Sequence, residues 1–312
     1  MFRNCHFDSR SNTIYLWETV RGENMYDEIP WTPSVYVPTN ENTGIKSIDG
    51  KPVKKLTFDT YNDYYTYQKD CDANVLENNV KAEIQFLTER YSSIPDDALE
   101  TPLLKIYVID IEVHSDKFPT AAKAAYPVTL ISIYDNLKNQ TFSFGLRPYD
   151  GKYKDEKFLK YFHCKDEETL LKMFFRFLEK YPCDVITGWN VQNFDILYLI
   201  NRCKNIFGED TRLFKSFSPI KNVRTWEAAN GKDTNMDIAG VSILDMMDLY
   251  KWYSPKKLER YSLDFVCKYE LEKGKVDYSE YKDLREVYEK NWNLYVEYNV
   301  IDAYRVAQLE DK

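Results

Sequence analysis

Four acidic residues in three separate segments are the strongest indication of chemistry in this chain. Asp110 and Glu112 stand two positions apart, Asp195 lies in the middle of the sequence, and Asp302 lies ten residues before its end. No cluster of His and Cys accompanies them. Carboxylates alone suit hard, oxygen-preferring cations, so Mg²⁺ or Mn²⁺ is favoured over zinc. The chemistry that most often needs such a cage is phosphodiester hydrolysis by two metal ions.

The first pair has a defined geometry. Residues 103–111 form an apolar, β-branched run, which predicts a strand buried on both faces. Asp110 and Glu112 would then project from the same face, where two like charges raise each other's pKa unless a cation lies between them. The alternative is a strand end that enters solvent, where such a pair has no special meaning.

The other two acids are expected on helices. Apolar residues recur at helical spacing over 291–309, so Tyr298 and Asp302 share one helix face. A phenol beside a metal-binding carboxylate can orient an attacking water, although core packing is the plainer interpretation of Tyr298. Asp195 follows a short strand and a turn, and it opens a helix that Gly208 closes. Its plainer interpretation is a first-turn acid that interacts with the helix dipole.

In this order, the three segments resemble the D-E-D-D 3′→5′ exonucleases with Tyr before the last Asp. The resemblance is greatest to the proofreading domain of family B DNA polymerases of T4-like bacteriophages, and it covers nearly the whole chain. It rests on Asp110-Ile111-Glu112, on the block from Asn190 to Asp195 and on the segment from Tyr298 to Asp302, with further similarity at 116–119, 240–245 and 261–263. It implies an α/β fold: a ribonuclease-H-like exonuclease domain (mixed sheet flanked by helices) over 101–312, after a smaller, strand-rich N-terminal domain over 1–100.

The resemblance also implies a role for each residue. Asp110, Glu112 and Asp302 would hold one metal that activates water, while Asp110 and Asp195 would hold a second at the leaving 3′ oxygen, and Tyr298 would orient the water. Phe118 matches a position that packs on the terminal base. Asn190 and Phe194 are assigned to substrate contacts by motif only.

A hairpin is expected between residues 222 and 241, because Asn230-Gly231 is a strong turn signal. It resembles the family's strand-separating hairpin, and its candidate DNA contacts are Arg224, Trp226 and Lys232. The implied substrate is the 3′ end of single-stranded or primer–template DNA.

Charge and composition limit the other possibilities. The net charge of −8 argues against a general nucleic-acid-coating protein, but not against a nuclease whose substrate phosphate is held by metal ions. Six scattered cysteines indicate reduced thiols in a cytoplasmic setting, that of the bacterial host if a phage encodes the chain. No apolar stretch is long enough to span a membrane. His114 is expected on the surface or behind the site.

Two groups of basic residues are interleaved with aromatic ones, a pattern that fits single-stranded nucleic acid and a solvated loop face equally well. The first group lies between residues 211 and 232, and the second comprises Lys251, Lys256, Lys257 and Arg260 around Trp252 and Tyr253.

Further elements follow from periodicity and turn residues. Strands are expected at 13–17, 33–37, 45–58, 127–134, 141–146 and 184–187, helices at 61–71, 168–180 and 195–207, and a linker at 92–97.

One departure from the family is large. No segment matches the polymerase palm motifs, so polymerase activity is not carried over, and a polymerase portion is expected to act in cis or in trans. Three other interpretations stay open: a DNA-binding accessory module whose nuclease is idle, an RNA-binding regulator, and a free-standing ribonuclease.

Overall fold

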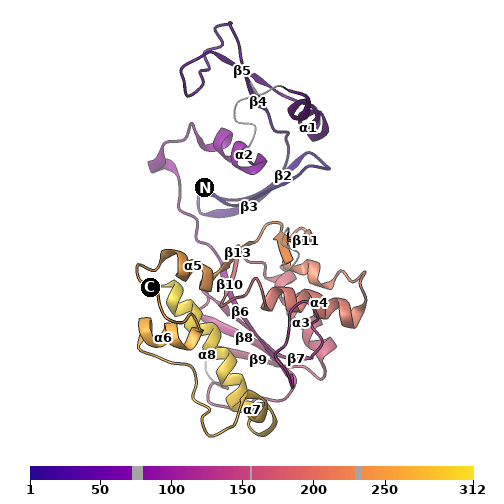
Figure 1. Ribbon diagram of the computed structural model, residues 1–312, viewed down its shortest axis with the longest axis vertical. Coiled ribbons are helices and arrows are strands. Elements are labelled where there is room, and N and C mark those ends of the chain that lie inside the picture. The colour runs from indigo at the N-terminus through magenta and orange to yellow at the C-terminus, as the bar shows by residue number, and fades with distance from the viewer. Residues whose placement is uncertain (72–79, 155–156, 229–233) are drawn as a thin grey trace. The chain divides into compact units, whose positions relative to one another are not determined.

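The computed structural model describes residues 1–71, 80–154, 157–228 and 234–312 (Figure 1). The chain divides into two compact units, Met1–Leu103 and Leu104–Lys312. The four candidate acids all belong to the second unit.

The N-terminal unit is built from two small antiparallel sheets and two helices. One sheet has the strand order β1-β2-β3 and the other pairs β4 with β5. Ile14 and Leu16 of β2 are fully buried, and they pack in one cluster with Phe86 of α2. The elements are β1 (Phe2–Asp8), β2 (Thr13–Val20), β3 (Glu23–Pro30), β4 (Val35–Pro38), β5 (Val53–Leu56), α1 (Tyr61–Asp70), α2 (Ala82–Tyr91) and η1 (Asp96–Ala98).

The second unit is organised around a six-stranded mixed sheet with the order β13-β10-β6-β7-β8-β9. Neighbours are parallel at β13/β10, β10/β6 and β8/β9, and antiparallel at β6/β7 and β7/β8. Its strands are β6 (Ile106–Val113), β7 (Val128–Asp135), β8 (Gln140–Gly145), β9 (Leu159–His163), β10 (Val185–Gly188) and β13 (Ser242–Asp245). The predicted α/β class with a mixed sheet is therefore confirmed.

Helices cover both faces of this sheet. Figure 1 shows α8 (Trp292–Glu310, yellow) across one face and α3 (Glu167–Lys180) with α4 (Asp195–Phe207) on the other. The remaining elements are η2 (Leu213–Phe217), β11 (Val223–Glu227), β12 (Thr234–Ile238), α5 (Met246–Tyr253), α6 (Leu263–Leu271) and α7 (Leu284–Lys290).

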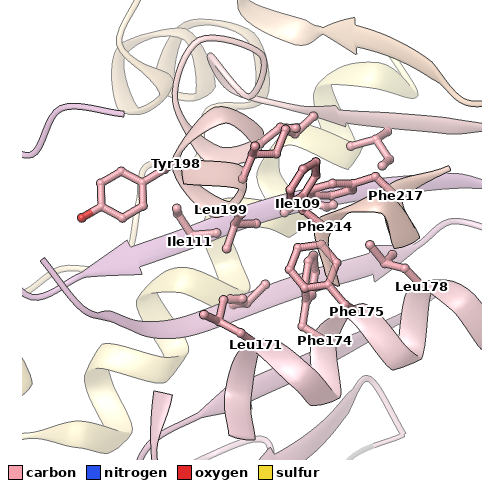
Figure 2. Close-up of a cluster of buried hydrophobic side chains, with 14 of the residues drawn as sticks. Ile109, Ile111, Leu171, Phe174, Phe175, Leu178, Tyr198, Leu199, Phe214 and Phe217 are labelled. Carbon is pink, nitrogen blue, oxygen red and sulfur yellow. The ribbon is translucent and has the colours of Figure 1, made fainter. Parts of the chain in front are cut away.

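The main core lies between the sheet and α3. In Figure 2, Phe174 and Phe175 of α3 point toward Phe217 of η2, and Ile109 and Ile111 of β6 border the same cluster. Phe174 and Phe175 pack edge-on against Phe217, with ring centroids 6.0 and 5.1 Å away. Since side chains alternate along a strand, burial of Ile109 and Ile111 here turns Asp110 and Glu112 toward the opposite face.

The three helices predicted for the second unit are confirmed, and they span 167–180, 195–207 and 292–310. The strand expected from residue 103 begins at Ile106 instead, and Leu103 is 73% exposed. The reason is that β10, its parallel neighbour, begins at Val185, which pairs with Ile106. Only Val53–Leu56 of the strand expected over 45–58 pairs with β4. The linker expected at 92–97 includes the start of η1.

A pair of phenylalanines tests the location of this core. Phe174→Ala should lower the free energy of unfolding by about 3–5 kcal/mol, because a fully buried ring leaves a cavity among other rings. Phe118→Ala is the matched control: its ring is 89% exposed, so the cost should stay within about 0.5 kcal/mol. Urea denaturation of both variants measures the difference, and similar costs would place the core elsewhere.

Candidate active site

Asp110 and Glu112 lie on β6, in the interior of the sheet. Asp110 stands opposite Ser132 of β7 and Glu112 stands opposite Leu130. Both side chains project toward the face that α8 covers, where Glu112 is 9% exposed and Asp110 is half-buried. The strand-end alternative, with both acids in solvent, is therefore wrong.

Asp195 is the first residue of α4 and is 4% exposed. Its Oδ1 accepts a hydrogen bond of 3.1 Å from the backbone N–H of Ile111, the residue between the first two acids. This bond joins the start of α4 directly to β6. A first-turn acid was expected, but its partner is a neighbouring strand rather than the helix dipole alone.

The loop before Asp195 is held by Asp245, for which the sequence indicated no role beyond its place in the similar segment 240–245. Asp245, at the N-cap of α5, accepts from the N–H groups of Asn190 at 3.0 Å and Gln192 at 3.1 Å, and from its own helix at Met247. Asn190 has a φ of +64°, an uncommon conformation for a residue with a side chain. Asp245 therefore anchors the turn that delivers Asn190 and Asp195.

Helix α8 contributes Tyr298, Asn299 and Asp302. Asn299 is fully buried, and its side-chain amide donates to Oδ2 of Asp110 at 2.5 Å. Oδ1 of Asp302 is buried without a hydrogen-bond partner in the described part of the chain. The three acidic segments thus converge between β6, α4 and α8.

Sequence reasoning missed Lys275, which lies between α6 and α7. Its ammonium group donates to the phenol oxygen of Tyr298 at 2.8 Å and forms a short ion pair with Oδ2 of Asp302. Residues 273–275 read Lys-Gly-Lys, and nothing in the sequence distinguishes Lys275 from its neighbour. Only the fold could reveal this contact. Tyr298 is therefore linked to the acids through a shared cation, although it is also largely buried, as core packing would require.

Burial raises the pKa of all four acids, and the other carboxylates of the site add to the shift at Asp110 and Glu112. Burial, reinforced by the charges of Glu112, Asp195 and Asp302, raises the pKa of Asp110 well above its ordinary value. Burial and Asp302 raise the pKa of Glu112 to about 8, and burial raises that of Asp195 to about 7. For Asp302, burial raises the pKa while the Lys275 ammonium opposes the shift. Such values mark a site with more negative charge than its surroundings compensate.

A cleft of about 370 Å³ opens beside Glu112, and two of the expected substrate residues line it. Phe118 projects into solvent there, and Phe194 is half-buried in its wall. His114 lines the same cleft, stacked on Tyr288 with 4.3 Å between ring centroids. His114 is therefore half-buried rather than a plain surface residue. Asn190 does not line this cleft.

The expected hairpin is formed by β11 and β12, which pair from Val223/Ile238 to Glu227/Thr234. Arg224 forms an ion pair of 2.7 Å with Asp237 across the hairpin, and Trp226 is 50% exposed. The expected turn at 230–231 and Lys232 lie outside the described residues. Neither Arg224 nor Trp226 lines the cleft beside Glu112.

Similarity to known proteins agrees with this geometry. The family described as DNA polymerase family B, exonuclease domain, matches residues 57–266. The chain belongs to this family. It is 30% identical to the DNA-directed DNA polymerase of Escherichia phage RB69 over 91% of this chain and 34% of that protein. The corresponding enzyme of Enterobacteria phage T4 is 28% identical over 96% of this chain and 36% of that protein.

More distant relatives include the DNA polymerase catalytic subunit of Saimiriine herpesvirus 2 (strain 11), which is 25% identical over 71% of this chain. The chain spans about a third of the length of the two phage polymerases. The family match ends before Lys275 and α8, whereas the phage alignments cover nearly the whole chain. No described helix is long and apolar enough to cross a membrane.

Family B exonuclease domains are generally metal-dependent, and the donor set here fits a hard divalent cation. The fit rests on four converging carboxylates with raised pKa values and on the unpartnered Oδ1 of Asp302. As arranged in this structure, no three His, Cys, Asp or Glu side chains of the described ranges stand close enough to hold a metal together. Cation binding would therefore require the carboxylates to move closer together.

The raised pKa of Glu112 predicts a pH dependence of stability. Without metal, the folded state holds this proton up to about pH 8, whereas the ordinary value is 4.5. The stability that protonated Glu112 contributes is complete below pH 4.5 and is lost as the pH rises toward 8. Relative to Glu112→Gln, the wild-type free energy of unfolding should fall over this range by about 1 kcal/mol or more, because one pKa unit corresponds to about 1.4 kcal/mol.

Urea denaturation with a chelator present measures this difference, and Glu209→Gln controls for the loss of an exposed acid. A wild-type minus Glu112→Gln difference that stays flat or rises with pH would contradict the electrostatics described here.

Proposed function

We propose that this chain is a metal-dependent 3′→5′ exonuclease that hydrolyses the terminal phosphodiester of single-stranded or frayed DNA. The observation that carries the proposal is the convergence of Asp110, Glu112, Asp195 and Asp302 from three distant segments. Membership in the family B exonuclease-domain family supports the reaction class. Although three of these acids have a donor or a cation beside them, the other carboxylates still raise the pKa values of Asp110 and Glu112.

The cofactors proposed are two Mg²⁺ or Mn²⁺ ions. When bound, such ions supply Lewis acidity for the attacking water and for the departing 3′ oxygen. Asp110, Glu112 and Asp302 are the proposed ligands of one ion, and Asp110 with Asp195 of the other. Asn299 holds the carboxylate of Asp110 in place through its amide, and the Ile111 N–H does the same for Asp195.

Tyr298 is proposed to orient the water as a hydrogen-bond donor. Burial and the Asp302 charge raise the pKa of Tyr298, so the phenol keeps its proton at neutral pH and cannot serve as a base. Burial disfavours the charge on Lys275, yet Asp302 and Tyr298 hold its pKa above the ordinary value. Lys275 therefore remains a cation whose hydrogen bond fixes the phenol oxygen.

Substrate contacts are proposed on either side of these acids. The exposed ring of Phe118 is available to pack on the terminal base, and Phe194 lines the same cleft. Asn190 is held within its turn by a hydrogen bond from Asn193. Arg224, Trp226 and Lys232 would contact DNA from the hairpin.

We assign residues 101–312 to the exonuclease domain and 1–100 to an N-terminal domain of the family B type, with a polymerase portion acting in cis or in trans. Nuclease activity of residues 101–312 alone tests this division, and its absence in a folded fragment would contradict it.

Removing the metal-binding carboxylates is the first test. Asp110→Ala and Asp302→Ala should each reduce Mg²⁺-dependent degradation of a 3′-labelled single strand by orders of magnitude, while circular dichroism shows an intact fold. Asp248→Ala removes a half-buried acid of α5 that pairs with Lys251 outside the site, so this control should keep wild-type activity. Near-wild-type activity of either site variant would refute the ligand assignment. DNA binding without any cleavage by the wild type would favour the idle accessory module.

The phenol should have a graded effect. Tyr298→Phe preserves the packing but removes the O–H, so single-turnover cleavage should slow by about 10²-fold or less, the lower end of what such groups contribute. A loss as large as that of Asp302→Ala would show that Tyr298 does more than orient water. An unchanged rate would make it a core residue.

The hairpin should matter for paired ends. A hairpin that separates primer from template must offset on the order of 1.4 kcal/mol for each base-pair step it opens. Replacing residues 225–237 by a tight turn should therefore slow digestion of a mismatched primer–template far more than that of a single strand. Equal slowing of both substrates would rule out a strand-separating role.

A further inference from the structure

A second hollow lies on the face of the sheet opposite the acids, between α3, the edge strand β9 and its neighbour β8. Its volume is about 450 Å³, and it shares no lining residue with the cleft beside Glu112. Ligand pockets typically measure about 300–1,000 Å³. The proposed nuclease mechanism makes no use of this hollow.

The floor of the hollow is apolar. Phe142 and Phe144 project from β8 and Phe162 from β9, and they meet Met173 and Phe177 of α3. The strand residues alternate, so they share one face of the sheet, and the two α3 residues are four apart on one side of the helix. Phe162 and Met173 are half-buried and so remain accessible from the hollow.

The rim is basic. Lys138, Lys160, Arg176 and Lys180 line the hollow with exposed side chains, and no acidic residue lines it. None of the four forms an ion pair with a described residue, although the chain as a whole carries a charge of −8. Three of the lysine ammonium groups lie 5.0–5.6 Å from ring centroids: Lys138 over Phe142 and Tyr181, Lys160 over Phe162, and Lys180 over Tyr181. Four uncompensated cations around an apolar floor favour a ligand that is both anionic and apolar.

The aromatic floor favours a peptide over a nucleic acid. Stacking of bases needs accessible ring faces, but Phe142, Phe144 and Phe177 are at most 8% exposed. Lys138 and Lys180 lie over the ring of Tyr181. By contrast, Trp252 of α5 is 84% exposed, so its ring face is accessible for stacking. A concave apolar floor instead suits an aliphatic or aromatic side chain.

We propose that this hollow binds an acidic peptide segment of a partner protein. An apolar side chain of the segment enters the hollow between α3 and β8–β9, and flanking carboxylates pair with Lys138, Lys160, Arg176 and Lys180. The proposal is independent of the nuclease chemistry, because the hollow and the four acids lie on opposite faces of the sheet.

Fluorescence anisotropy with the 312-residue chain tests this. The probe is a fluorescein-labelled peptide in which aspartates and glutamates flank one leucine and one phenylalanine. A second peptide carries serines in place of the leucine and phenylalanine, and labelled oligothymidylate is the nucleic-acid probe. The variant Lys160→Glu/Arg176→Glu is compared with Lys256→Glu/Lys257→Glu, which changes the net charge equally in the second basic group. Thermal unfolding of both variants should match the wild type, and the nuclease activity of Lys160→Glu/Arg176→Glu should be unchanged.

The apolar acidic peptide should bind the wild type, and its affinity should fall when salt is added. Its affinity for Lys160→Glu/Arg176→Glu should be lower by about tenfold or more. It should bind the Lys256→Glu/Lys257→Glu variant normally, and the serine peptide should bind the wild type more weakly. No binding at low salt, or equal losses in both variants, would overturn the proposal. If Lys160→Glu/Arg176→Glu lost affinity for oligothymidylate but kept its affinity for the peptide, the hollow would be assigned to nucleic acid instead.

Discussion

Four carboxylates in one buried site are the constraint on which the second unit of this protein depends. Burial alone disfavours each charge, and proximity adds mutual repulsion. The protein offsets this with fixed donors: the amide of Asn299 on Asp110, the N–H of Ile111 on Asp195 and the ammonium of Lys275 on Asp302. The shifted pKa values show that these donors are insufficient. The remaining negative charge is what would attract the divalent cations of the proposed function.

The sheet makes this arrangement possible. β6 turns its isoleucines toward the aromatic core of α3 and η2, and its acids toward α8. Asp245 secures the turn between β10 and α4, so that Asp195 starts its helix beside Ile111. One face of the sheet therefore packs against the aromatic core, and the other carries the acids of the proposed active site. The proposed peptide hollow uses the core-packed face, where α3 meets β8 and β9.

Local pattern was sufficient to predict the mixed α/β fold and the helices with strong apolar periodicity, and the motifs pointed to the family. Elements with weak local signals were missed. β9 and β13 are short edge strands defined by their pairing, and α5, α6 and α7 are short helices. The roles of Lys275 and Asp245 could not be predicted, because they depend on contacts with residues 27 and 55 positions away. The half-buried place of His114 could not be decided either, since its partner, Tyr288, is still more distant in sequence.

Counting bound Mn²⁺ by electron paramagnetic resonance tests the central claim most directly, because it does not depend on substrate or turnover. About two ions should bind per wild-type chain at saturation, and markedly fewer in Asp110→Asn, since Asp110 is the proposed ligand of both. The Asp248→Asn variant should bind as the wild type does. A wild-type chain that binds no Mn²⁺, or an Asp110→Asn variant with an unchanged count, would contradict the account.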